Sequence, residues 1–395
     1  MHPRLKDSAL KAQESLFLYN YRFDERYELD FESFNFLKQF TGKNSLTEII
    51  KATGADEKEA AGLIEYLSSE GCIEDRLDEK AQTTFDVADP ILPSLRYLQL
   101  HITERCNLNC AHCYLGKKGK KDLELSLIKK ALAEFSPNGL KLLITGGEAP
   151  LHKKFWEVAE IASKYPIRVE LLSNGTLITP TVAEKLSKYV HSVQISLDGL
   201  KEGHEILRGP GSFENTINGI KNASKYLDVN IATMVHNENL GEFVELEKLV
   251  DELGAREWNL DIPSLAGNAT AELIPTASAA ADIFRQYGFG SGVHEGDSGY
   301  SCGSHICTID TFGGVSKCGF FEDIVGSIKD ENLMALWTRV VAKYTPKVDE
   351  LKCAGCLVLD ECRGGCRYRA QVNGDFMGKD PFMCTLHLKA GANDD

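Results

Sequence analysis

One pattern recurs six times between residues 96 and 264: a short apolar run typical of a buried strand, then a segment whose apolar residues often have helical spacing. Parallel strands joined by helices require right-handed crossovers, so six such units predict an α/β fold, a partial (β/α)6 TIM-like barrel. Ligands in such folds bind at the carboxyl ends of the strands. The predicted strands are 96–103, 141–147, 169–175, 192–199, 229–236 and 257–264, and the predicted helices include 126–135, 155–165 and 241–254.

The loop after the first predicted strand carries Cys106, Cys110 and Cys113, in the sequence CNLNCAHC. The spacing C-x3-C-x2-C supplies three thiolates, whereas a cubane [4Fe–4S] cluster has four irons. One iron would therefore lack a protein ligand and could bind a small molecule, as open metal sites in enzymes do. A zinc site is the alternative interpretation of this triad.

Small polar or charged residues follow the next strands, at the edge where the cysteine loop is expected. The segment LLITGGEAP places two glycines and a glutamate after the second strand, and glycine lets a backbone approach a ligand closely. Each residue alone has an ordinary explanation as a turn or a surface charge, but their placement in series favours one site. The candidates are Tyr114, Gly146, Gly147, Glu148, Ser173, Asn174, Ser196, Asp198 and Arg208.

With these motifs in this order the chain resembles the radical S-adenosylmethionine (SAM) enzymes. The resemblance implies that the cysteine triad holds a [4Fe–4S] cluster whose open iron binds SAM. It also implies that the GGE segment (146–148) contacts the SAM ammonium, that Tyr114 packs near the adenine and that Arg208 faces the SAM carboxylate. The polar residues at the next two strand ends suit ribose and carboxylate contacts. A flavodoxin or ferredoxin would supply the electron that cleaves SAM to methionine and a 5′-deoxyadenosyl radical.

Eight of the twelve cysteines lie beyond residue 300. They resemble the SPASM domain of radical SAM enzymes, which implies two auxiliary [4Fe–4S] clusters, three clusters in all. Zinc ribbons and disulfides are the alternatives, but the opening MHPRLKDSAL has no apolar signal segment, which argues against disulfides. By the ligand order of that family, Cys302, Cys307, Cys318 and Cys366 would hold one cluster and Cys353, Cys356, Cys362 and Cys384 the other, although spacing alone does not assign the pairs.

The first ninety residues form a different pattern, in which strand-like runs precede three helical segments. Ser45 and Asp56 are suited to cap the second and third helices. This order predicts a small winged-helix-like α+β domain. The strand-like runs are 14–20 and 21–30, and the helical segments are 31–40, 45–53 and 57–70.

This N-terminal pattern resembles the RiPP recognition element of peptide maturases. The resemblance implies that the leader of a ribosomally made precursor peptide binds here, as a strand added along 21–30 and facing 57–70. A winged helix that binds DNA, or one that only packs on the barrel, is the alternative. Residues 1–90 carry 19 acidic against 11 basic residues, which disfavours a phosphate partner.

Length and charge fit three domains: 1–90, the winged-helix-like module; 91–290, the barrel; and 291–395, the SPASM region. A net charge of −14 disfavours nucleic acid, and no apolar run reaches the roughly 18 residues that span a membrane. We therefore expect a cytoplasmic protein without nucleic-acid or membrane partners. The run KKGKK (117–121) is predicted to be a solvated lid that can attract an acidic peptide.

The leading hypothesis for function is a maturase that forms a thioether, carbon–carbon or similar crosslink in a precursor peptide. A second hypothesis is a sulfatase-maturing enzyme, whose eight-cysteine pattern this chain resembles. Members of that group commonly carry an acidic residue, as a base, next to the third cysteine of the SPASM pattern. Here Gly319 follows Cys318, which weakens this hypothesis. A third hypothesis is a tetrapyrrole-modifying enzyme of the haem pathways, but such an enzyme has no evident need for a peptide-binding domain. A fourth is an iron–sulfur electron carrier, which would not need the residues assigned to SAM. Asn259 and Asp261, at the end of the sixth strand, alternate onto one face, so Asp261 is the candidate catalytic base.

Overall fold

The computed structural model describes residues 1–290, 299–301 and 303–387. Its central sheet has the strand order β11-β10-β9-β8-β7-β6-β12-β13-β14. Among the described strands β11 pairs only with β10, so the barrel is open at that edge. The six parallel strands are those predicted from the sequence: β6 (Tyr97–His101), β7 (Lys141–Thr145), β8 (Arg168–Ser173), β9 (Ser192–Ser196), β10 (Asp228–Met234) and β11 (Glu257–Asp261).

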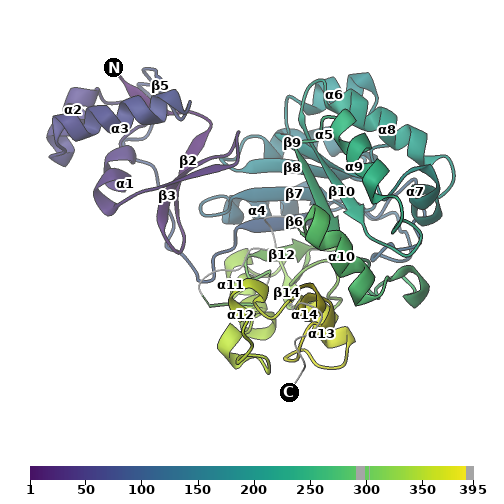
Figure 1. The fold of residues 1–395 in the computed structure, drawn as a ribbon. Coiled ribbons are helices and arrows are strands. Elements are labelled where there is room, and N and C mark those ends of the chain that lie inside the picture. Colours follow the sequence, from purple (N-terminus) through teal and green to yellow (C-terminus); the bar gives the residue numbers. More distant parts are fainter. Residues whose placement is uncertain (291–298, 302, 388–395) are drawn as a thin grey trace.

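Helices cover one face of the six strands, and the main hydrophobic core lies between the two layers (Figure 1). Alternation along β6 sends Leu98 and Leu100 into this core, where Ile128 and Leu132 of the first helix also lie, and leaves Gln99 on the other face. The helices are α4 (Leu125–Phe135), α5 (Phe155–Ala162), α6 (Pro180–Leu186), α7 (Lys201–Arg208), α8 (Ser212–Ala223), α9 (Phe243–Glu252) and α10 (Ala277–Tyr287), with 3-10 turns η1 (Ala149–Leu151) and η2 (Ala271–Leu273).

The C-terminal region continues the barrel sheet, which the sequence pattern did not predict. β12 (Ile306–Ile309) pairs in parallel with β6, and β13 (Gly314–Ser316) and β14 (Gly326–Ser327) follow in antiparallel order. The sheet thus crosses the domain boundary predicted at residue 290. The remaining elements are α11 (Leu333–Tyr344), η4 (Val348–Glu350), α12 (Leu359–Cys362), α13 (Arg367–Val372) and α14 (Pro381–His387).

The N-terminal module has its own core, separate from that of the barrel. The helices are α1 (Phe31–Leu37), α2 (Leu46–Thr53) and α3 (Glu57–Ser69), and Ser45 and Asp56 cap α2 and α3 as predicted. The strands differ from the prediction: a three-stranded sheet contains β2 (Ser8–Ala12), β3 (Leu16–Asn20) and β4 (Glu25–Glu28), and β1 (Pro3–Leu5) pairs with β5 (Ile73–Asp75).

Two corrections to the predicted strands follow. The sequence pattern missed β2, because a five-residue strand that carries Lys11 lacks a clear apolar alternation. The run 21–30 is not one strand, because residues 21–24 form a turn and only four residues pair with β3.

The module contacts the barrel at the amino ends of the parallel strands, opposite to the end from which the cysteine loop emerges. Lys141, the first residue of β7, forms an ion pair with Asp24 (2.6 Å). Arg168, the first residue of β8, donates from a guanidinium N–H to the carbonyl of Arg22 (2.5 Å). Lys11 donates from Nζ to the carbonyl of Ser136 (2.7 Å). In Figure 1 the strands β2 and β3 lie between the module's helices and the barrel.

Among the helices that the structure describes, none combines the length and the apolar character that crossing a membrane requires.

Candidate active site

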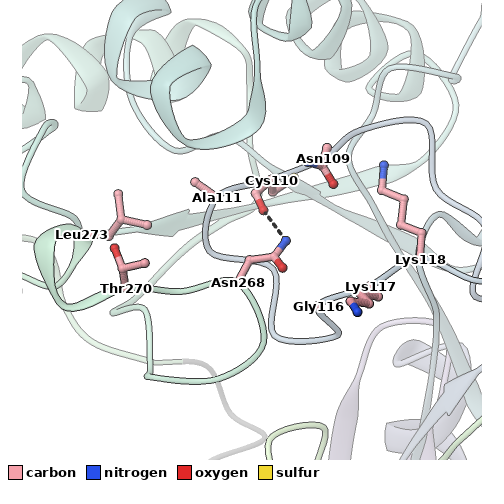
Figure 2. Close-up of a pocket in the computed structure, with 9 residues that line it drawn as sticks. All are labelled: Asn109, Cys110, Ala111, Gly116, Lys117, Lys118, Asn268, Thr270 and Leu273. Atoms are coloured by element: carbon pink, nitrogen blue, oxygen red, sulfur yellow. Dashed lines mark hydrogen bonds between the residues drawn. The ribbon is translucent and has the colours of Figure 1, made fainter.

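The cysteine loop follows β6 and is fastened to two other segments by hydrogen bonds. The N–H of Ala111 donates to the carbonyl of Leu207 in α7 (2.8 Å). Asn268, in the loop after β11, donates from its backbone N–H to the carbonyl of Cys113 (2.9 Å) and from Nδ2 to that of Cys110 (3.2 Å), the bond drawn in Figure 2. The loop is therefore held by the helix on one side and by the end of the barrel on the other.

The three thiols of this loop are half-buried and close enough to interact electrostatically. Burial raises the pKa of Cys106, and the charges of Glu148 and Cys113 raise it further. Burial also raises the pKa of Cys110, an effect that Arg208 opposes and the neighbouring cysteines reinforce. Three thiolates gathered in this way are costly unless positive charge lies among them, and the irons of a cluster would supply it.

The donor set fits a cubane with one open iron. In the stretches that the structure describes, no three Cys, His, Asp or Glu side chains are grouped as a single metal ion would need. A cubane is larger than one ion, because its four irons occupy separate corners, and the thiolates that hold it stand farther apart. The sequence assigns three cysteines to this loop, and the structure places them within electrostatic reach of Glu148, Asp198 and Arg208.

The GGE segment (146–148) lies directly against the root of the cysteine loop. The N–H of Gly147 donates to the carbonyl of Thr103 and the N–H of Glu148 to that of Arg105, both at 2.7 Å. A Cβ atom on Gly146 would lie 2.4 Å from the Thr103 carbonyl oxygen, and one on Gly147 would lie 2.4 Å from that of Arg105. The glycines are thus required for backbone contact with the loop itself, whereas the sequence suggested contact with a ligand.

Glu148 joins the ends of β7 and β8. Its Oε1 accepts from the hydroxyl of Ser173 (2.6 Å) and its Oε2 from the N–H of Asn174 (2.9 Å). The side chain is buried, and this burial raises the pKa of Glu148 to about 7 against the opposing effect of both hydrogen bonds. Asn174 also donates from Nδ2 to Oδ1 of Asn107 in the cysteine loop (3.0 Å). Three sequence candidates therefore meet beside the loop.

Asp198 and Arg208 form a buried ion pair at the ends of β9 and α7. Oδ1 of Asp198 also accepts from the N–H of Met234 (2.8 Å). Burial alone would raise the pKa of Asp198, but Arg208 above all holds it at about 2. The guanidinium also senses the charges of Cys110 and Glu148, so it lies at the site, and its first partner there is Asp198.

The sequence analysis did not single out His112, which lies among these residues. Its Nδ1 is buried and has no hydrogen-bond partner in the described part of the chain. Burial, assisted by the charge of Arg208, lowers the pKa of His112 to about 4, so the ring is neutral near pH 7. The only signal in the sequence was its position between the second and third cysteines.

Tyr114 points away from this group, toward the loop after β13. Its ring centroid lies 5.2 Å from that of Phe320, and a Cβ atom on Gly319 would lie 2.7 Å from the ring. The hydroxyl is 3.4 Å from nitrogen atoms of both Gln99 and His101. Tyr114 thus connects the cysteine loop with the C-terminal region, and its contact with adenine remains a prediction.

The inner face of the barrel carries the other candidates. The register of β9, β10 and β11 places Ser196, Asn259 and Asp261 on one face. Asn259 donates from Nδ2 to Oε1 of Gln194 (3.4 Å). Asp261 lies 3.5 Å from a guanidinium nitrogen of Arg369, which comes from the C-terminal region. The role of Asp261 as a base remains a prediction.

Six C-terminal cysteines form two groups among the described residues, whereas Cys307 lies in the main hydrophobic core and Cys302 lies outside the described residues. Burial raises the pKa of Cys318 to about 11, and Cys366 adds to this rise. Burial also raises the pKa of Cys362 to about 11, and the charges of Cys384, Asp380 and Cys353 add to this rise. The charges of Cys353 and Cys356 act on Cys384. Cys307, fully buried on β12, has its pKa raised to about 12 by burial.

A cavity of about 760 Å³ opens beside the cysteine loop (Figure 2). Lys117 and Lys118 of the KKGKK run line it, opposite Thr270 and Leu273 from the segment after β11. Nζ of Lys118 lies within hydrogen-bonding distance (3.5 Å) of the carbonyl of Cys106. The basic run is therefore part of the rim of the site.

Comparisons with known proteins agree with this geometry. A family model described as the radical SAM superfamily matches residues 100–250. Mycofactocin maturase MftC of Mycolicibacterium smegmatis is 30% identical over 303 residues, which cover 68% of this chain and 77% of that protein. The AdoMet-dependent heme synthase of Methanosarcina barkeri is 28% identical over 334 residues, 73% of this chain and 95% of that protein.

A solved structure extends the likeness to nearly the whole chain. Streptococcus suis SuiB bound to precursor peptide SuiA superposes with a TM-score of 0.71, over 97% of this chain and 99% of that chain, at 16% identity. The cysteine-rich C-terminus fits the SPASM type of these enzymes. The chain therefore belongs to the radical SAM superfamily, whose members bind S-adenosylmethionine and a [4Fe–4S] cluster.

Proposed function

We propose that this protein is a peptide maturase that oxidatively crosslinks a ribosomally made precursor peptide, through a thioether, carbon–carbon or similar bond. One observation carries the proposal: an N-terminal module with an open sheet edge is attached to a radical SAM barrel, and this whole arrangement superposes on SuiB. The name of MftC, a maturase, points the same way.

In this proposal Cys106, Cys110 and Cys113 hold the cluster to which SAM binds. When bound, cluster and SAM supply a one-electron cleavage that yields a radical able to remove a hydrogen atom from the substrate. The residues of the chain bind and orient. Glu148, buried and near its titration point, would bind the SAM ammonium, and that cation would favour the ionised carboxylate.

Two auxiliary clusters would accept the electron that an oxidised substrate gives up. The proximity of Cys318 and Cys366 supports one ligand set, completed by Cys302 and Cys307. The mutual effects of Cys353, Cys362 and Cys384, with Cys356, support the other. Because eight thiolates close both cubanes, we assign these clusters to electron transfer rather than to substrate binding. A flavodoxin or ferredoxin is the proposed external reductant.

The proposed leader site lies along β4, away from the cysteine loop. β4 is an edge strand, so its outer N–H and C=O groups are available to an added strand. Tyr27 of β4 packs edge-on against Tyr66 of α3 at 6.0 Å, and Tyr66 is 52% exposed. Tyr27 also donates to Glu70 (3.0 Å), so two aromatic rings and a carboxylate lie beside this edge. We expect a leader with an apolar anchor and a nearby basic residue.

The first experiment tests SAM chemistry. The anaerobically reconstituted protein, with SAM and dithionite, should release 5′-deoxyadenosine. Replacement of Cys106, Cys110 and Cys113 by alanine should abolish the release. Cys72→Ala is the matched control, because Cys72 is a buried cysteine of the N-terminal module and should be dispensable. Absence of the nucleoside from the unaltered, iron-loaded protein would exclude the proposed reaction.

The second experiment tests the peptide. Short peptides encoded beside this gene are incubated with the iron-loaded protein, SAM and dithionite. Each crosslink should remove two hydrogen atoms from the peptide, and mass spectrometry measures this loss. Tyr66→Ala should weaken leader binding, measured by fluorescence anisotropy, and should leave SAM cleavage without peptide unchanged. Tyr226→Ala, an exposed tyrosine at the amino end of the barrel, is the control. Equal binding by both variants would remove β4 and α3 as the leader site.

A tetrapyrrole reaction is the second candidate, because the heme synthase of Methanosarcina barkeri aligns over 73% of this chain. The test is to incubate the iron-loaded protein with SAM, dithionite and iron-containing tetrapyrrole precursors of haem, which should give no tetrapyrrole product. Turnover of a tetrapyrrole, with no change in any neighbouring peptide, would favour this candidate over the maturase.

A further inference from the structure

Arg369 occupies an unusual position between the barrel and the cysteines. It lies on α13, three residues after Cys366, and only 12% of its side chain is exposed. Its guanidinium is enclosed by aromatic rings, 5.1 Å from the centroid of Phe382 and 5.9 Å from that of Phe289. A buried cation is costly, so its partners should show what holds it there.

Two carboxylates from different parts of the fold bind this guanidinium. Nε of Arg369 donates to Oδ2 of Asp380 (3.0 Å). A terminal nitrogen lies 3.5 Å from Oδ1 of Asp261, the last residue of β11 and the candidate base on the inner face of the barrel. Arg369 therefore connects the barrel mouth directly to the C-terminal region.

Asp380 in turn connects this cation to both cysteine groups. Its Oδ2 accepts from the N–H of Cys366 (2.9 Å), and its backbone carbonyl accepts from the N–H of Cys384 (3.0 Å). The side chain is buried. Cys366 and Cys384 belong to the two different ligand sets assigned above, so Asp380 lies where those sets adjoin.

Negative charges outnumber positive charges around Arg369. Two carboxylates share one guanidinium, and the nearby thiolate of Cys366 adds a third negative charge that acts on Arg369. In a dry environment such charges interact strongly. The cation thus faces Asp261 at the barrel mouth on one side and the cluster ligand Cys366 on the other.

We propose that Arg369 is a positioning residue that couples the barrel-mouth carboxylate of Asp261 to the auxiliary cluster held by Cys366, and that its positive charge raises the reduction potential of that cluster. The inference rests on the proposed auxiliary clusters. An electron added to a cluster increases its negative charge, and a fixed cation close to a ligand stabilises the reduced form. Asp261 opposes this effect from the barrel side.

The test measures the midpoint potentials of the auxiliary clusters by redox titration followed with electron paramagnetic resonance. The background is the full chain with Cys106, Cys110 and Cys113 replaced by alanine, which removes the signal of the SAM-binding cluster. Arg369→Gln should move the potential of one auxiliary cluster to a more negative value. Arg369→Lys keeps the charge and should retain most of the original potential. Asp261→Asn should move it to a more positive value.

Arg339→Gln is the matched control, because Arg339 forms an exposed ion pair with Glu331 on the same region of the chain and should leave both potentials unchanged. Unchanged potentials in an Arg369→Gln protein that retains its iron would overturn the inference. If Arg369→Gln loses its cluster, the Asp261→Asn protein decides the outcome, and a potential that does not become more positive in that protein would overturn the inference. An unaltered chain that binds only about four irons would instead refute the auxiliary clusters themselves.

Discussion

The N-terminal module and the C-terminal region are attached to the same barrel in opposite ways. The module keeps a core of its own and contacts the barrel at the amino ends of the strands, through ion pairs, through Lys11 and through a small buried cluster of Phe17, Tyr19 and Leu140. The C-terminal region extends the barrel sheet through β12, and Trp337 of α11 lies in the barrel's own core. A module with a core of its own can fold as a separate unit, whereas a shared core holds the C-terminal region rigidly against the barrel.

The C-terminal region itself has two parts. Its strands, α11 and, through Phe382 and Met383, α14 are held by the common core. In the last part, between α11 and α14, the elements are short, from three to six residues, and four cysteines lie there: Cys353, Cys356, Cys362 and Cys366. Such short helices are not stable by themselves, so cluster ligation is expected to order this last part.

The largest expected effect follows from removing iron. The iron-free protein should be cut rapidly by trypsin between Lys352 and Lys379, and anaerobic reconstitution should protect this segment, because ligation would replace the missing hydrophobic core. The N-terminal module should be digested at the same rate in both forms. Mass spectrometry of the fragments is the measurement, and equal protection of residues 352–379 in both forms would contradict the comparison.

The next prediction concerns the separate hydrophobic cores of the barrel and the N-terminal module. Trp337→Ala should lower the free energy of unfolding of the barrel by about 3–5 kcal/mol, since it removes a fully buried ring and the hydrogen bond from Nε1 to the Pro93 carbonyl (2.9 Å). Phe36→Ala should destabilise the module by a similar amount and leave the barrel unaffected. Hydrogen exchange resolved by segment measures both. Loss of protection throughout the chain in Phe36→Ala would show that the cores are not independent.

A smaller effect should depend on pH. Burial lowers the pKa of Lys11 from 10.5 to about 7. Between those values the unfolded state binds a proton that the folded state does not, so the free energy of unfolding should rise as pH increases from 7 to 10.5. The rise should be less than the roughly 5 kcal/mol given by the full pKa difference. Lys11→Met should remove this slope in urea titrations at several pH values, and an unaltered slope would place the origin elsewhere.

The smallest effect concerns one helix of the module. Asp56 caps α3 by accepting from the N–H groups of Lys58 and Glu59. Asp56→Ala should cost about 1 kcal/mol, and Asp56→Ser should recover most of it. Local hydrogen exchange of α3 is the measurement. A loss of the same size in the barrel would mean that the module and the barrel unfold together.

Much of the barrel and its site was predictable from the sequence. The six strands fell at the expected residues because each carries its own apolar pattern, and the strand-end candidates converged because parallel strands end at one edge. Glu148, Ser173 and Asn174 meet there by direct hydrogen bonds. In the N-terminal sheet, β3 falls within the predicted run 14–20, whereas β2 was missed and β4 is shorter than predicted, because short strands with few apolar residues give weak patterns.

By itself, the sequence determined the parallel strands, the three thiolates on one loop and the helix caps, because neighbouring residues in the chain encode these features. Only the tertiary structure decided that β12 pairs with β6, that Tyr114 turns toward Phe320 and that Arg369 joins Asp261 to Asp380. Those contacts join residues far apart in the chain. Their formation depends on how complete elements pack together, and no local pattern of residues carries that information.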